Sequence, residues 1–121
     1  MDKAGKYVDG FVVPVPKENI DAYREMSETA GRVWKEHGAL EYIECVADDV
    51  KPGKVTSFPQ AVKLEDGEVV VFSWIVYDSR EHRDRVNAAV MSDPRINMDP
   101  KTMPFDGMRM FWGGFGVLLA M

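Results

Sequence analysis

The sequence predicts a single α+β domain, spanning residues 1–121, in which strands and helices follow the order β-α-β-β-α-β. Three observations predict this class. Several stretches are rich in β-branched and aromatic residues, two segments between them carry apolar residues at helical spacing, and the turn dipeptide Asp66-Gly67 lies between strand-like segments. With 45% hydrophobic and 29% charged residues, the chain has the composition of one globular domain.

The first predicted strand covers residues 7–13, which are mostly valine and aromatic residues. We expect it to end at Pro14-Val15-Pro16, because proline cannot donate a hydrogen bond to a neighbouring strand. Asn19 is then expected to cap a helix by accepting backbone N–H groups. The residues at helical spacing are Ile20, Tyr23, Ala30, Val33, Trp34 and His37.

Two glycines mark this helix. Gly38 follows its last turn, where glycine adopts a left-handed conformation that other residues resist. Gly31 lies inside the helix, and its small size there indicates a close contact with the sheet. The second strand is predicted at residues 40–47, and a polar loop follows it.

The middle of the chain is predicted to form a hairpin. Residues 61–65 and residues 68–77 flank Asp66-Gly67, and both of these turn positions tolerate a positive φ. The sequence therefore predicts two adjacent antiparallel strands at this place.

The second helix is predicted to begin after Ser79, whose hydroxyl can cap it, and to end before Asp93-Pro94. Its apolar side consists of Val86, Ala89 and Val90. The last strand is predicted at residues 108–119. This order of elements is the ferredoxin-like, or split βαβ, arrangement.

The predicted strands are apolar on both faces. Residues 69–76 are almost entirely apolar, and Met110-Phe111-Trp112 repeats this pattern in the last strand. Two helices can cover only one face of a four-stranded sheet, so the other face needs a partner. The sequence therefore predicts a homodimer that pairs through this sheet face.

Composition argues against several other classes. The net charge is -5 and the basic residues are scattered, which disfavours nucleic-acid binding. Cys45 is the single cysteine and only two histidines occur, so we expect neither a disulfide nor a metal site, and no cofactor. The first residues lack the apolar core of a signal peptide, and no apolar stretch is long enough to span a membrane. We therefore expect a cytoplasmic protein without a membrane partner.

Six strings of the sequence resemble the YbaA-like family of uncharacterised bacterial proteins. They are YVDGFVVPVP at 7–16, GALEY at 38–42, ECVADD at 44–49, VFSWIVY at 71–77, HRDRVN at 82–87 and MPFDG at 103–107. The resemblance implies a dimeric α+β barrel, in which two sheets pack face to face. That superfamily includes cofactor-independent oxygenases, haem-degrading enzymes, isomerases and ligand-binding modules. The family brings no catalytic residues to carry over.

Alternation along each strand groups the side chains that share a face. The groups are Tyr7, Asp9, Phe11 and Val13; Tyr42, Glu44 and Val46; Phe72, Trp74 and Val76; and Met110 and Trp112. We hypothesise that all four groups line one cavity inside the homodimer, with aromatic walls and two carboxylates. Ligand sites commonly combine apolar walls with few polar groups.

Asp9 and Glu44 are the first candidate catalytic residues, because a carboxylate in an apolar cavity has a raised pKa suited to acid–base work. Alternatively, they pair with Arg109 or another basic group, or lie in water at the cavity mouth. His82 is a third catalytic candidate, although a histidine in a charged helical turn is commonly just solvated. The candidate ligand-binding residues are Tyr42, Trp74, Trp112, Phe11 and Arg109. Residues 103–106 are a candidate rim or lid over the cavity.

Four functions remain open at this point. The first is a cofactor-independent enzyme, oxygenase- or isomerase-like, that acts on a small aromatic or carbonyl compound. The second is a non-catalytic ligand-binding or stress-related dimer, and the third is a surface for a protein partner. The fourth is haem handling: Trp74 and His82 resemble positions used by haem-degrading relatives, but Asp9 replaces the expected asparagine.

Overall fold

The computed structural model describes residues 6–96 and 99–121. Its elements are β1 (Tyr7–Pro16), a 3-10 turn (Lys17–Asn19), α1 (Ile20–Glu36), β2 (Glu41–Val46), α2 (Phe58–Ala61), β3 (Glu68–Tyr77), α3 (Arg80–Met91) and β4 (Phe111–Gly116). The predicted α+β class is confirmed, and the short helix α2 has no counterpart among the predicted elements. No helix in the described part of the chain has the length and hydropathy needed to cross a membrane.

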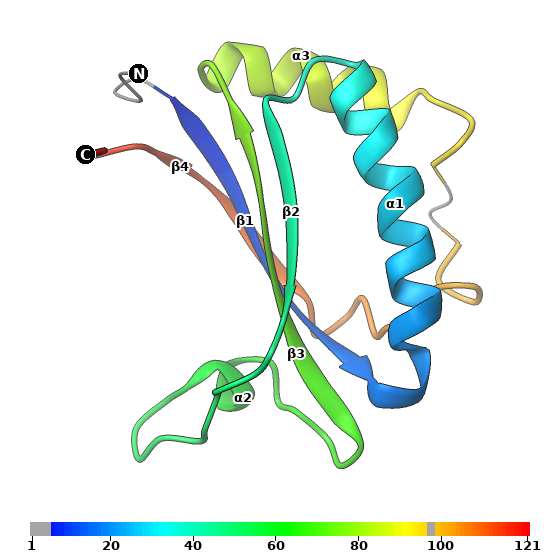
Figure 1. Ribbon diagram of the computed structural model, residues 1–121, viewed down its shortest axis with the longest axis vertical. Coiled ribbons are helices and arrows are strands. Elements are labelled where there is room, and N and C mark those ends of the chain that lie inside the picture. The colour runs from blue at the N-terminus through cyan, green and yellow to red at the C-terminus, as the bar shows by residue number, and fades with distance from the viewer. Residues whose placement is uncertain (1–5, 97–98) are drawn as a thin grey trace.

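The strands form one antiparallel sheet in the order β2-β3-β1-β4. The central strands β1 and β3 pair from Tyr7 opposite Tyr77 to Pro16 opposite Glu68, and β2 and β4 form the edges. Figure 1 shows α1 and α3 on one side of this sheet. The other side carries no long helix, so the two faces have different environments.

Strand β1 continues through its two prolines, so the prediction that it ends there is wrong. Backbone amides along a strand point alternately to its two neighbours. The Lys17 amide donates to the Gly67 carbonyl (2.8 Å), which places the nitrogens of Pro14 and Pro16 on the opposite side of β1. Pairing with β4 ends at Val12, so neither proline has to donate a hydrogen bond there.

The predicted hairpin strand at residues 61–65 is also wrong. The chain forms helix α2 and two turns instead, and β3 begins directly after Gly67, whose φ is 82°. Ser57 caps α2 by accepting the Gln60 amide, and Pro59 lies in the first turn, where proline favours a helix. These local helix signals outweigh the strand pattern.

The ends of the two long helices agree only in part with the predictions. Gly38 has a φ of 118° after α1, and Ser79 accepts the His82 amide at the start of α3, as predicted. Asn19, however, makes no side-chain cap hydrogen bond. Its side-chain amide instead donates to the Pro104 carbonyl (3.1 Å), and the 3-10 turn leads directly into α1.

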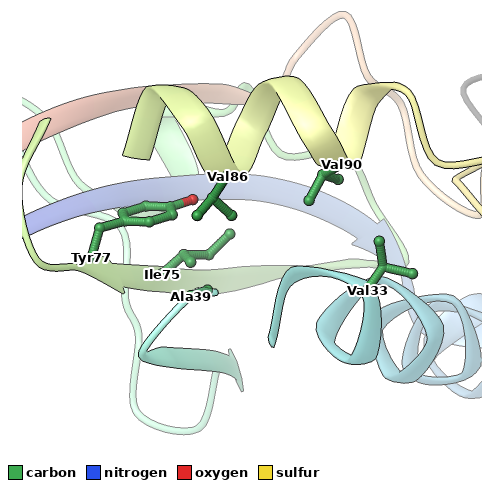
Figure 2. Close-up of a cluster of buried hydrophobic side chains, with 6 residues drawn as sticks. All are labelled: Val33, Ala39, Ile75, Tyr77, Val86 and Val90. Carbon is green, nitrogen blue, oxygen red and sulfur yellow. The ribbon is translucent and has the colours of Figure 1, made fainter. Parts of the chain in front are cut away.

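The main core lies between the sheet and the two long helices. Figure 2 shows the buried cluster in which α1, α3 and β3 meet; its members are Val33, Ala39, Ile75, Tyr77, Val86 and Val90. Gly31 of α1 faces β2 so closely that a Cβ there would lie 2.8 Å from the Tyr42 ring. The predicted close contact at Gly31 is therefore confirmed.

The opposite face of the sheet is apolar and largely open. Val62, Val12 and Val70 form a small buried cluster at one end of it. The exposed large apolar residues on the rest of this face are Ile43, Phe72, Phe111 and Phe115. The prediction that the sheet is apolar on both sides is confirmed.

Candidate functional site

The strand register decides which candidate residues share a face. Asp9 lies opposite Ile75, which in turn lies opposite Tyr42. Trp74 lies opposite Gly10, one position away, and therefore points to the other face. The hypothesis that the Trp74 group lines the same cavity as Asp9 is wrong, because alternation within a strand does not fix the register between strands.

A cavity of about 610 Å³ lies between the sheet and the helices of a single chain. Its apolar wall includes Phe11, Trp34, Ile75, Met91, Ile96, Met103, Phe105, Met110 and Trp112. Its polar wall includes Asp9, Tyr23, Tyr42, Glu44, Ser73, Asn87 and Arg95. The expectation that the two carboxylates face a chamber between two sheets is therefore corrected, because both line a cavity on the helix-covered side.

Asp9 is the most deeply buried charged residue in this cavity, with 1% of its surface exposed. Its Oδ1 atom has no hydrogen-bond partner, and neither has the Nε atom of Arg83, which lies 3.6 Å away. Burial raises the pKa of Asp9, while the charge of Arg83 acts in the opposite direction. Asp9 is thus an acid whose environment favours the protonated form, next to a cation that favours the charged form.

Two aromatic residues hold Arg83 and the neighbouring polar groups in place. The Tyr7 hydroxyl accepts a hydrogen bond from Arg83 (3.0 Å), and the guanidinium lies 4.9 Å from the centre of the Tyr7 ring. Tyr77 donates a hydrogen bond to the Asn87 side-chain oxygen (3.1 Å). The Trp34 indole N–H donates to the Tyr77 hydroxyl and to the same Asn87 oxygen (3.1 Å each). Burial, followed by the charge of Asp9, raises the pKa of Tyr77, so its hydroxyl stays a donor.

Glu44 lies further along the same face, on the edge strand β2. Its two carboxylate oxygens accept hydrogen bonds from Tyr23 of α1 (2.8 Å) and Tyr42 of β2 (2.9 Å). Burial raises the pKa of both tyrosines far above the usual range, and the charge of Glu44 adds to this effect. Both hydroxyls therefore remain neutral donors that fix the carboxylate.

A second hollow, an open groove of about 580 Å³, runs between α1 and β2. Tyr23, Tyr42 and Glu44 line both the groove and the inner cavity, so this trio forms the wall between them. Ser27 also lines the groove, and its hydroxyl is buried without a hydrogen-bond partner.

Two candidate residues lie away from the cavity wall. The imidazole of His82 accepts the Asp78 amide through Nδ1 (2.9 Å) and packs edge-on against Tyr77. Arg109 binds Glu68 through two hydrogen bonds of 2.6 and 2.7 Å and Asp106 through one of 2.9 Å. Of the alternative in which the carboxylates pair with Arg109 or another basic group, the Arg109 part is wrong, because Arg109 binds Glu68 and Asp106. The other part is confirmed for Asp9, which has Arg83 3.6 Å away.

The remaining candidates lie at the cavity mouth. Trp112 stacks on Phe11 with ring centres 6.0 Å apart, and 54% of its surface is exposed. Met103 and Phe105, from the predicted rim segment, line the cavity, and Phe105 packs edge-on against Tyr23.

Arg83 and Asn87 are the polar residues that the sequence reasoning missed. They are spaced by four positions on α3, and their neighbours Val86 and Val90 are buried. Polar residues on the apolar side of a helix indicate a buried polar cluster. That signal is present in the sequence and could have identified both residues.

The family model described as "Protein of unknown function (DUF1428)" matches residues 6–107. The chain belongs to this family. It is 58% identical over 110 residues to the uncharacterized protein YbaA of Escherichia coli K12, covering 91% of this chain and 94% of that protein, and equally to YbaA of Shigella flexneri. The resemblance to the YbaA-like family is confirmed, and the names of these relatives assign no activity.

Among solved structures, the de novo designed protein Foldit4 aligns with a TM-score of 0.45 and 13% identity, covering 95% of this chain and 99% of that chain. For this family member, the chemistry has to be argued from the cavity itself. Within the described residues, no three His, Cys, Asp or Glu side chains form a group that could hold a metal ion.

Proposed function

We propose that the cavity binds a small aromatic or carbonyl compound and that Asp9 acts on it as a general acid or base without a cofactor. One observation carries this proposal: a 1%-exposed carboxyl group with an unpartnered oxygen lines a cavity of mostly apolar walls. A cavity of this size and composition is typical of small-molecule sites. Buried polar groups without a partner are rare in proteins and need an explanation.

The surroundings of Asp9 support a proton-transfer role. Burial favours the protonated acid, and the Arg83 guanidinium, 3.6 Å away, stabilises the carboxylate that forms when the proton leaves. The raised pKa brings Asp9 closer to the protonation equilibrium that a general acid–base group needs.

The other catalytic candidates receive different roles in this proposal. Glu44 has both oxygens fixed by tyrosine hydroxyls, so we assign it to ligand binding. His82 contacts Asp78 and Tyr77 and takes no part. We do not favour the haem alternative, because Asp9 replaces the expected asparagine and the register puts Trp74 on the other face of the sheet from Asp9.

The test uses proton exchange, since a general base next to a carbonyl compound removes a proton from the adjacent carbon. A panel of aromatic and aliphatic ketones and aldehydes is incubated with the protein in D₂O, and deuterium incorporation is followed by NMR. We expect exchange with the wild type and with the surface control Asp66→Asn. In Asp9→Asn the rate should fall by about 100-fold or more. Equal rates for Asp9→Asn and wild type would show that Asp9 is not the acid–base group.

Native mass spectrometry of the gently purified protein separates this proposal from the ligand-binding alternative. A retained compound that stays chemically unchanged during incubation, with no exchange in the panel, would favour a non-catalytic binding module. Conversion of the compound would support the enzyme.

We also propose that the chain has the ferredoxin-like arrangement and forms a dimeric α+β barrel in the cytoplasm. The strand order β2-β3-β1-β4, with both long helices on one face, supports the first part. The exposed apolar residues of the other face support pairing through that face. Cys45 is a free and exposed thiol, which suits a reducing compartment.

A further inference from the structure

We propose that the cavity selects amines: its ligand has an apolar body of aromatic size and a protonated amino group that binds Glu44. This inference rests on the proposed function only in placing a ligand in the same cavity. It concerns the charge of that ligand, which proton transfer by Asp9 does not determine.

Three prominent hydrogen-bond donors of the cavity wall, Tyr23, Tyr42 and Arg95, already have partners within the chain. The hydroxyl hydrogens of Tyr23 and Tyr42 both go to Glu44. Arg95 is the one cation among the described residues lining the cavity, and its guanidinium donates to Asp93 and Glu36 at 2.8–3.0 Å. An anionic ligand would therefore meet two hydroxyls that already donate to Glu44 and a guanidinium that Asp93 and Glu36 already neutralise.

The acceptors of the wall, in contrast, are not exhausted. A carboxylate has about four acceptor sites on its two oxygens. Each oxygen of Glu44 accepts one tyrosine hydroxyl, so further sites remain for a ligand. Among the described residues, no group donates a hydrogen bond to the Oδ1 atom of Asp9. This excess of acceptors suits a ligand that is rich in donors, and an ammonium group brings three donors and the complementary charge.

The position of Glu44 suits the polar end of an elongated ligand. Glu44 lies opposite Ser73, Ser73 lies opposite Phe11, and Phe11 stacks on Trp112. Strands are spaced by about 4.8 Å, so this row extends roughly 10 Å from β2 to β1. An amine bound at Glu44 therefore places its apolar body over Ser73 and against the aromatic rings of the far wall.

The rings of the wall also favour a cation. The Trp34 and Tyr42 rings lie 6.0 Å apart, centre to centre, and both residues line the cavity. Aromatic faces attract ammonium groups, with tryptophan the strongest of them. The Tyr42 hydroxyl holds Glu44, so the ring and the carboxylate act on the same part of a ligand.

Cations do occur on the outer side of Glu44, along the groove. Arg24 pairs with Glu28 (3.5 Å), and Lys35 donates to the Leu40 carbonyl (2.7 Å). Arg32 is exposed to solvent. Solvent and salt screen charges in such positions, so the inner carboxylate determines the preference of the cavity.

The experiment uses three probes with one body: 3-phenylpropan-1-amine, 3-phenylpropan-1-ol and 3-phenylpropionate. Trp34 and Trp112 line the cavity, so binding is followed by tryptophan fluorescence and checked by calorimetry at pH 7. We expect the amine to bind about tenfold more tightly than the alcohol, because of one charge-assisted hydrogen bond, and the carboxylate to bind most weakly. Glu44→Gln should remove the advantage of the amine over the alcohol. The control Glu41→Gln alters the same strand on its exposed side and should leave the ranking intact.

Four results would overturn the inference. They are equal binding of all three probes, tighter binding of the carboxylate, no binding of any probe, and an unchanged amine preference in Glu44→Gln. The ranking in the wild type stands as a test even if Glu44→Gln does not fold. Binding is measured without turnover, so a failure of the exchange assay for Asp9 leaves this ranking unaffected.

Discussion

At the scale of single residues, the important feature is the open ion pair between the buried Asp9 carboxyl group and the Arg83 guanidinium. Asp9 and Arg83 each carry a buried side-chain atom without a hydrogen bond, 3.6 Å from each other. A purely structural pair would be expected to close this gap, because unpaired buried polar atoms cost free energy. In the proposed site, a ligand would complete these hydrogen bonds.

The raised pKa of Asp9 predicts how stability depends on pH. Between the unfolded and the folded pKa, the native protein binds more protons than the unfolded chain, so the free energy of unfolding falls as pH rises through this window. Asp9→Asn lacks this titration. We therefore expect the variant to gain stability relative to wild type as pH increases from about 4, in urea unfolding curves.

Asp66→Asn is the matched control, because Asp66 is exposed in a turn. Its stability should follow that of wild type across the same pH series. A constant difference between Asp9→Asn and wild type from pH 4 to 8 would contradict a raised pKa of Asp9 in the folded protein.

At the scale of elements, the contact of α1 with β2 fixes the wall between cavity and groove. Tyr23 of α1 donates to Glu44 of β2, and Gly31 lets the helix approach the Tyr42 ring. Both contacts connect the same two elements, so the position of Glu44 depends on how closely α1 packs on the edge strand.

Gly31→Ala tests this packing. Alanine favours a helix by about 1 kcal/mol over glycine, but its Cβ would lie 2.8 Å from a ring whose hydroxyl is held by Glu44. We expect the clash to dominate and the free energy of unfolding to fall by about 1–3 kcal/mol. Gly116→Ala is the control, since nothing lies within 4 Å of a Cβ there, and it should change stability by less than about 0.5 kcal/mol. A more stable Gly31→Ala would show that Tyr42 moves freely and that the wall is not rigid.

At the scale of the whole molecule, the two faces of the sheet separate two roles. The helix-covered face carries the cavity with Asp9 and Glu44, and the open face carries Phe72, Phe111 and Phe115. Because the cavity lies within one chain, the proposed dimer is needed to cover the open face and is not needed to form the site.

Phe72→Asp tests whether the open face forms the dimer and whether the site works without it. A charge in the centre of the open face should convert the proposed dimer to a monomer in sedimentation velocity, because burying an unpaired carboxylate is costly. The monomer should keep its affinity for the phenylpropylamine probe. Val55→Asp, at an exposed apolar residue outside the sheet, should remain dimeric. A wild type that is monomeric at micromolar concentration would rule out pairing through this face.

The sequence by itself determined the α+β class, the ends of the helices at Gly38 and Ser79, and the apolar character of both sheet faces. These features depend on local propensity, capping and periodicity, which act over a few residues. The exceptions are also local: Asn19 bonds to Pro104 and not to its own helix, and the signals of Ser57 and Pro59 outweigh a strand pattern.

Only the tertiary structure decided what the candidate residues face. The register places Trp74 away from Asp9, and the packing of α3 brings Arg83 to Asp9 across more than 70 positions of sequence. The packing of the helices on the sheet puts the cavity inside one chain. Alternation orders side chains within a strand, but a shift of one residue between strands exchanges the two faces. That choice is made by packing between distant segments, and no local pattern encodes it.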